Sequence, residues 1–177
     1  NLTASDMLRK ISLRFLLANI EACDEVWVVS HGAGENLRSI GYEGDYLVME
    51  NGTDFEKRRA PRPEVEALRR QHGIAPQDTV FLFVGRMMWY KGIRLSLDAL
   101  ARAKAQGAHF RYILVGDGTD RKEIADYIEQ LGLGAECVMT GAIRDRELLR
   151  RYFTLADLFL FPSTFDTNGI VVREAAA

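Results

Sequence analysis

Short, strongly apolar runs alternate with helical patterns along most of this chain. From residue 79 onward the apolar runs lie at residues 80–84, 112–115, 137–140 and 158–161. Strands that are apolar along their whole length, with helices between them, indicate a parallel sheet that is covered on both faces. The connections in such a sheet are right-handed β–α–β crossovers. The alternation therefore predicts an α/β fold, a Rossmann-like, doubly wound parallel sheet.

The helical patterns divide into two series. In the longer series, helices are predicted at residues 64–72, 93–105, 120–131 and 145–156. A shorter series precedes it, with a helix at 7–20, a buried strand at 25–29, a helix capped by Ser30 and a strand at 45–49. The turn cluster NGTD and two prolines then interrupt the pattern. We therefore expect two parts, residues 1–51 and residues 52–177.

Composition and charge exclude several classes of protein. The net charge of −2 provides no general attraction to nucleic acid, so no nucleic-acid partner is expected. Two cysteines far apart in the sequence, with no CxxC pair, predict neither a disulfide framework nor a zinc site, and they fit a reducing cytoplasm. The three histidines have no partner at metal or triad spacing, so no metal site is predicted. The chain begins without methionine, and we expect it to be a piece of a longer protein.

In a doubly wound sheet, ligands bind beyond the carboxyl ends of the strands, so the loops there carry the candidate site. The first loop reads GRMMWYKG, in which Gly85 allows a sharp turn and Arg86 and Lys91 bring two cations together. Two such cations can hold a diphosphate, although surface cations on a loop are also common. Because the loop is not GxxxxGK[ST] and no strand leads into GxGxxG, a P-loop NTPase and a dinucleotide-binding dehydrogenase are both disfavoured.

The remaining loops are less specific. VGDGTD is explained by a tight turn, with Thr119 or Asp120 capping the next helix, and TGAIRD offers exposed backbone to a nucleobase edge. The last loop contains Asp166 and leads through Gly169 into a helix that carries Glu174. The amides at the start of that helix can bind a phosphate, and Glu174 can accept hydrogen bonds from sugar hydroxyls. The alternative is that Asp166 caps the helix and Glu174 lies on its surface.

Taken in order, these motifs carry a family resemblance. FVGRMMWYKG, LVGDG, VMTGAI, ADLFLFPS and FDTNGIVVREAAA resemble the retaining glycosyltransferases of family 4, which have the GT-B fold. Upstream, CDEVWVVSHG and VMENGTD resemble the end of the acceptor-side domain and the interdomain linker. The resemblance implies that residues 52–177 are a truncated nucleotide-sugar-binding domain, the donor-binding half of a GT-B fold. Residues 1–51 would then be the end of the acceptor-side domain and the linker.

The resemblance also implies roles for individual residues. Arg86 and Lys91 are expected to act in catalysis on the donor diphosphate, and Asp166 near the hydroxyls of the donor sugar. The residues expected to bind the donor are Gly85, Gly141, Ala142, Ile143, Asn168, Gly169, Ile170 and Glu174. Within this set, residues 141–143 would face the nucleobase, residues 169–170 the phosphates or sugar, and Glu174 the ribose. Asp166 stands where the family usually has Glu, and Asn168 where Phe is common.

The implied activity is transfer of a hexose from a nucleotide diphosphate sugar, a UDP-sugar, to a glycan or lipid of the cell envelope, with retention of configuration. Two cations and a helix N-terminus can stabilise the leaving diphosphate, so no cofactor or metal is expected. The whole protein would be cytoplasmic, with peripheral association at the inner face of the membrane, and the fragment alone inactive. Two alternatives are a nucleotide-sugar epimerase of GT-B architecture and a non-catalytic nucleotide-sugar-binding module.

Overall fold

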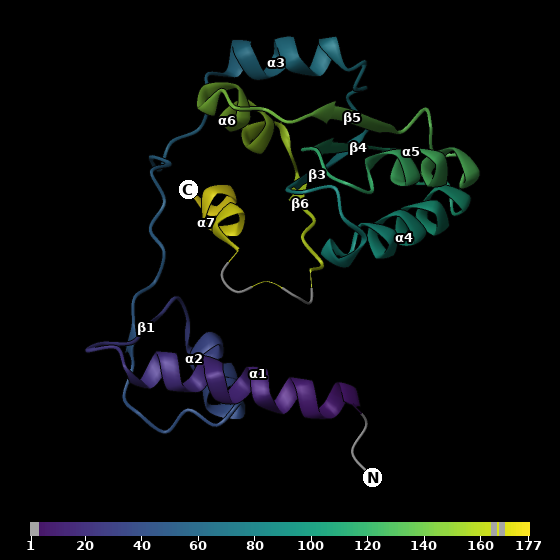
Figure 1. Ribbon diagram of the computed structural model, residues 1–177. Helices are drawn as coiled ribbons and strands as arrows, with labels where there is room; N and C mark the ends of the chain where they lie inside the picture. The colour runs from purple at the N-terminus through teal and green to yellow at the C-terminus, as the bar shows by residue number, and fades with distance from the viewer. Residues whose placement is uncertain (1–3, 164–165, 167–168) are drawn as a thin grey trace. The chain divides into compact units, whose positions relative to one another are not determined.

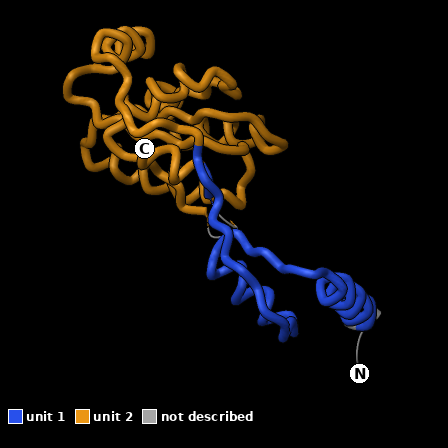
Figure 2. Tube along the Cα trace, turned by 90° about the vertical axis from the view of Figure 1, so that its left-hand side faces the viewer, with its two compact units in different colours: residues 1–53, 167–170 blue, residues 54–166, 171–177 orange. Residues whose placement is uncertain are grey.

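The computed structural model describes residues 4–163, 166 and 169–177 (Figure 1). Two compact units are distinguished in Figure 2: residues 1–53 with 167–170, and residues 54–166 with 171–177. Each unit is described by itself.

The described residues of the first unit form two helices and a two-stranded parallel sheet. Its elements are α1 (Ala4–Glu21), β1 (Trp27–Val28), α2 (His31–Ser39) and β2 (Leu47–Val48). The Ser30 hydroxyl accepts a hydrogen bond of 3.1 Å from the Ala33 amide, so the predicted cap of α2 is confirmed. The prediction of a buried strand at residues 25–29 is wrong for Trp27, which is exposed while Val28 is buried. Successive strand residues point to opposite faces, and here only one face is covered.

The second unit is built on a parallel sheet with the strand order β5-β4-β3-β6. Its strands are β3 (Thr79–Val84), β4 (Phe110–Val115), β5 (Cys137–Gly141) and β6 (Leu158–Phe159). The helices are α3 (Arg62–Gln71), the 3-10 turn η1 (Trp89–Lys91), α4 (Ile93–Ala105), α5 (Arg121–Gln130), α6 (Arg146–Leu155) and α7 (Ile170–Ala176), whose first residue groups with the other unit. The predicted α/β class is confirmed.

A separate hydrophobic core lies on each face of the sheet. Val80 and Leu82 of β3 pack with residues of α3 and α6, whereas Phe83 packs with residues of α4 and α5 (Figure 1). All three side chains are fully buried, and burying a side chain of this size stabilises the fold by roughly 1.5–3 kcal/mol. Helices on both faces make the sheet doubly wound.

The strand order creates a switch point between β3 and β6. From β3 the chain moves outward through β4 to β5, and it then returns to β6 on the other side of β3. The helices that follow β3 and β6, α4 and α7, pack against opposite faces of the sheet. In open parallel sheets, the crevice at such a point is where ligands bind.

Candidate functional site

Glycines bring the carboxyl ends of three neighbouring strands into close contact. The Gly85 amide donates to the Val115 carbonyl at 3.0 Å, and the Gly116 amide donates to the Gly141 carbonyl at 2.8 Å. Gly116 has φ +143°, and a Cβ at this position would lie 1.8 Å from the Gly85 carbonyl oxygen. No side chain fits there. The local glycines thus set the edge of the sheet from which the candidate loops emerge.

The loop after β3 contacts the loop after β6 at Gly92. Gly92 has φ +77°, and a Cβ at this position would lie 2.3 Å from the Pro162 carbonyl oxygen. This close approach places Lys91 against the second loop, where its Nζ donates to Asp166 Oδ2 at 2.6 Å. The Lys91 side chain is 10% exposed and that of Asp166 24% exposed. The structure therefore brings two of the three predicted catalytic residues into a largely buried ion pair.

Arg86, the third predicted catalytic residue, lies exposed on the loop after β3. Its Nη2 donates to the Tyr90 hydroxyl at 2.9 Å, and the Tyr90 ring centroid lies 5.1 Å from Lys91 Nζ. A guanidinium has five N–H donors, so one bond to Tyr90 orients Arg86 while leaving it able to bind an anion. Tyr90 thus contacts both cations, a role that the sequence does not predict.

The loop after β4 supports the cationic loop, a role that the sequence does not predict. The Met87 amide donates to the Asp117 carbonyl at 3.0 Å, and the Asp120 amide donates to the Met87 carbonyl at 3.1 Å. Asp120 Oδ2 accepts from the Trp89 amide at 2.8 Å. The prediction that the side chain of Thr119 or Asp120 caps α5 is wrong, because no side-chain bond caps this helix. The Asp120 carboxylate instead holds the start of η1.

A β-bulge marks the end of β5, where the sequence predicts contact with a nucleobase. Leu114 pairs with Met139 and Val115 with Gly141, so Thr140 is an extra residue on β5. Gly141 has φ +78°, which a glycine tolerates. Beyond it Ala142 is exposed, and Ile143 packs against the core under α3 and α6. Bulges of this kind redirect the chain beside binding sites, but the contact with a nucleobase stays a prediction.

Glu174 lies in α7 and is held by an arginine at the start of α6. Arg146 Nη1 donates to Glu174 Oε1 at 2.7 Å, and the Glu174 side chain is only 12% exposed. This burial argues against Glu174 as a solvated surface residue of the helix. The sequence did not single out Arg146, because its partner lies 28 positions away in the chain.

Three of the predicted donor-binding residues cannot be placed in this arrangement. Asn168 lies outside the described residues, and Gly169 and Ile170 group with the first unit. The described part of the second unit therefore presents two clusters. One contains Lys91 and Asp166 with Arg86 nearby, and the other contains Glu174 and Arg146.

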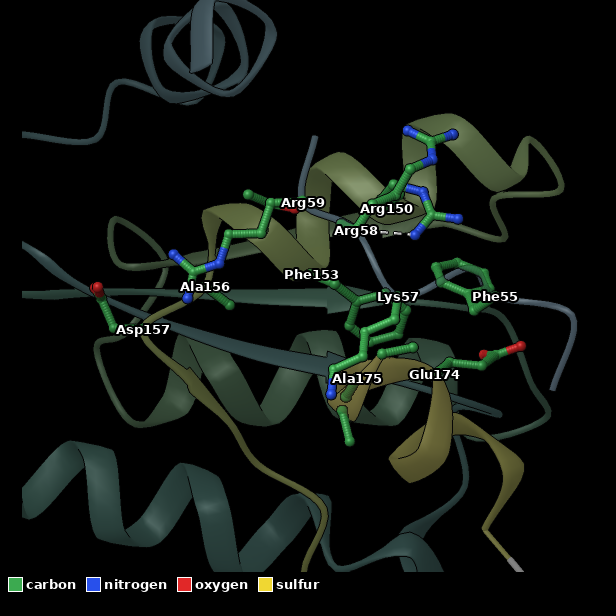
Figure 3. Close-up of a pocket in the computed structure, with 13 residues that line it drawn as sticks. Phe55, Lys57, Arg58, Arg59, Arg150, Phe153, Ala156, Asp157, Glu174 and Ala175 are labelled. Atoms are coloured by element: carbon green, nitrogen blue, oxygen red, sulfur yellow. Dashed lines mark hydrogen bonds between the residues drawn. The ribbon is translucent and has the colours of Figure 1, made fainter. Parts of the chain in front are cut away.

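A cavity of about 760 Å³ lies beside α6 and the end of α7 (Figure 3). Glu174 and Arg150 line it, but Arg86 and Lys91 do not. We therefore place the candidate site at the switch point of the sheet rather than in this cavity. Among residues 4–163, 166 and 169–177, no cluster of three or more acidic, cysteine or histidine residues is arranged to hold a metal ion. No helix in the described ranges is both long and apolar enough to cross a membrane.

Comparison with known proteins adds independent information on this fold. The sequence profile of the family described as Glycosyl transferases group 1 matches residues 64–177. A 2-deoxystreptamine glucosyltransferase of Streptomyces kanamyceticus is 32% identical over 130 residues, covering 72% of this chain and 33% of the relative. An alpha-monoglucosyldiacylglycerol synthase of Acholeplasma laidlawii is 26% identical over 146 residues, covering 81% of this chain and 36% of the relative.

Among solved structures, Anabaena HepE in complex with UDP and glucose matches with a TM-score of 0.80 and 24% identity. The match covers 99% of this chain and 48% of HepE. The chain thus spans between a third and a half of the length of these three proteins. Its architecture matches that of GT-B glycosyltransferases.

Proposed function

Because the chain belongs to the glycosyl transferases group 1 family, we propose that its second unit binds the nucleotide diphosphate sugar of a retaining hexosyltransferase. The observation that carries this proposal is the pair of cations, Arg86 and Lys91, on one loop at the switch point of the sheet, with Asp166 against Lys91. The whole protein is proposed to transfer the sugar. Residues 1–51 would supply the end of its acceptor-side domain and the linker.

In the proposed reaction an acceptor hydroxyl attacks the anomeric carbon from the side that the diphosphate leaves, and its proton passes to an oxygen of the departing diphosphate. Negative charge grows on the β-phosphate as its bond to the sugar breaks, so the main requirement is positive charge already in place. Arg86 offers a forked donor and Lys91 a compact charge. These groups supply the stabilisation without a metal ion. Asp166 would accept a hydrogen bond from a hydroxyl of the donor sugar.

We propose a UDP-sugar as the donor and a glycan or lipid of the cell envelope as the acceptor. The solved structure of HepE in complex with UDP and glucose supports this choice of donor. The acceptor class draws on the name of the Acholeplasma relative, a diacylglycerol glycolipid synthase. Such an acceptor would place the whole protein in the cytoplasm, at the inner face of the membrane.

The first experiment measures ligand binding by the 177-residue chain. Thermal unfolding is followed with UDP-, GDP- and ADP-sugars, because a ligand that binds only the folded state raises the midpoint. We expect UDP-sugars to stabilise the chain, and the variants Arg86→Ala and Lys91→Ala to lose most of this effect. Lys122→Ala, on the exposed face of α5, is the matched control. Equal stabilisation of wild type and both loop variants would refute the assignment of the site.

The second experiment measures transfer from a radiolabelled UDP-sugar. We expect transfer or slow hydrolysis by the whole protein, and binding without transfer by the 177 residues. A whole protein that binds the donor but never cleaves it would instead be a binding module.

A further inference from the structure

Residues 54–60, here called the linker strap, run along one face of α6. Arg150 donates from Nη1 to the Glu56 carbonyl at 2.6 Å and to the Arg58 carbonyl at 3.2 Å. One turn further along α6, the Thr154 hydroxyl accepts from the Ala60 amide at 3.0 Å. Residues four apart on a helix lie on the same side, so these contacts form one continuous row. The backbone of the strap is therefore attached to side chains of α6 by hydrogen bonds.

Phe55 anchors the start of the strap. Its ring is buried and meets Phe153 edge-on, with the ring centroids 5.6 Å apart. The guanidinium carbons of Arg146 and Arg150 lie 4.3 Å and 4.6 Å from the Phe55 ring centroid. Figure 3 shows Phe55, Phe153, Arg150 and Glu174 around the cavity described above. Contact with an aromatic ring restrains a guanidinium as well as attracting it.

Arg146 extends the row by one turn and joins the strap to Glu174. Its Nη1 donates to Glu174, and its Nη2 donates to Asp54, the first residue after the boundary of the first unit. Both arms of the guanidinium fork are thus used on carboxylates from distant parts of the chain. Glu174 is the acid proposed to bind the ribose, and Asp54 is the first residue of the strap.

An ion pair on a protein surface usually contributes little, and Arg146 itself is 43% exposed. Glu174 is in a different position, because its side chain is 12% exposed and a buried carboxylate needs a charged or hydrogen-bonding partner. Arg146 provides that partner at 2.7 Å, in an orientation restrained by Phe55.

We propose that Arg146 is a positioning residue that orients Glu174 for the ribose of the donor, and that it does so while the strap is docked through Asp54. The inference rests on the proposed function, because it assumes that Glu174 accepts hydrogen bonds from ribose hydroxyls. A carboxylate has about four acceptor positions, so Glu174 can keep its bond to Arg146 and still accept from a sugar. Donor affinity then depends on a contact within the second unit, between Arg146 and Asp54.

The test compares UDP with its 2′,3′-dideoxy counterpart, because only the first carries ribose hydroxyls. Isothermal titration calorimetry of the 177-residue chain is expected to show tighter binding of UDP. For Arg146→Ala we expect UDP affinity to fall about tenfold and affinity for the dideoxy compound to change little, the size expected for one hydrogen bond to a charged group. Arg146→Lys keeps the charge but not the fork, and is expected to retain part of the preference.

Arg151→Ala is the matched control. Arg151 lies in the same helix, is similarly exposed and pairs with Glu64 at 2.7 Å, away from the strap. We expect it to keep the preference for UDP. Asp54→Asn is expected to reduce the preference about threefold and to speed amide hydrogen exchange in residues 54–60.

The outcomes separate the two proposals. If the wild-type chain binds neither UDP, GDP nor ADP, the proposed function fails and the role of Arg146 fails with it. If the wild type prefers UDP to the dideoxy compound and both Arg146 variants keep that preference, only the role of Arg146 is refuted. If the affinities for UDP and for the dideoxy compound fall equally in the variants, Arg146 acts through the general stability of the fold, and its role in positioning Glu174 is refuted.

Discussion

Breaking the ion pair between Lys91 and Asp166 is expected to lower the stability of the fold and to raise its affinity for UDP. The substitution Asp166→Asn keeps the shape of the side chain and removes its charge, which leaves the Lys91 ammonium with a neutral partner. Because the Lys91 side chain is 10% exposed, we expect the folded state to lose stability. The same change frees the ammonium from a competing anion, so we expect the affinity for UDP to rise.

The size of each effect follows from the exposure of the pair. Breaking a fully buried pair costs about 3–5 kcal/mol, whereas an exposed pair is worth about 0–1 kcal/mol. Asp166 is 24% exposed, so solvent screens part of its charge, and we expect a loss of about 1–2 kcal/mol. Release of the ammonium is expected to tighten UDP binding about fivefold, which corresponds to about 1 kcal/mol.

Urea unfolding provides the stability, and calorimetric titration of the same chain provides the affinity. A double-mutant cycle with Lys91→Met and Asp166→Asn isolates the coupling between the two side chains. The pair of Lys122 and Asp126 at 2.9 Å is the control, because both side chains are largely exposed. A coupling no larger than that of the control, or weaker UDP binding by Asp166→Asn, would refute the reasoning.

Three further predictions concern the scaffold. Gly116→Ala is expected to cost at least 2 kcal/mol in urea unfolding, because it adds strain at φ +143° to a steric clash with backbone. Burial lowers the pKa of His72 below its usual value of 6.5, so as the pH falls the unfolded state binds a proton before the folded state does. The free energy of unfolding should therefore decrease as the pH drops below 6.5, until the folded-state pKa is reached. His72→Gln should make the free energy of unfolding less dependent on pH in this range. Burial raises the pKa of the Cys137 thiol to about 12, so in the folded chain at pH 8 only the exposed Cys23 should react with a thiol reagent. Cys137 should react once urea unfolds the chain. Equal reaction of the two cysteines in the folded chain would contradict this prediction.

The sheet and its helices could be predicted because their signal is local. A strand buried on both faces is apolar along its length, and the bounds of α4 at residues 93 and 105 follow directly from its pattern. The positions of Lys91 and Asp166 at the carboxyl ends of strands follow from the same alternation. Their direct contact needs the strand order, which places β6 beside β3 and is not encoded in any one segment.

The supporting residues of the site could not be predicted, because their partners are distant in sequence. The bond from the Trp89 amide to Asp120 spans 31 positions, and the bond from Arg146 to Asp54 spans 92. An aspartate before a helix is most simply explained as a cap, and an arginine in the first turn of a helix has no evident role by itself. Both acquire their partners only when the loops are brought together by the sheet.

The two ion pairs proposed to act on the donor differ in what the donor would do to them, and this difference can be tested. Lys91 carries a single positive charge, which the Asp166 carboxylate already offsets, so a diphosphate must compete with that carboxylate for the charge. Glu174 accepts from Arg146 on one oxygen and has further acceptor positions, so ribose hydroxyls add to that bond without displacing it. Removing the Asp166 charge therefore relieves competition for Lys91, whereas removing Arg146 disorders Glu174, the acceptor for the ribose. Asp166→Asn should tighten UDP binding and Arg146→Ala should weaken it, and changes of the same sign in the two variants would show that the pairs do not have these separate roles.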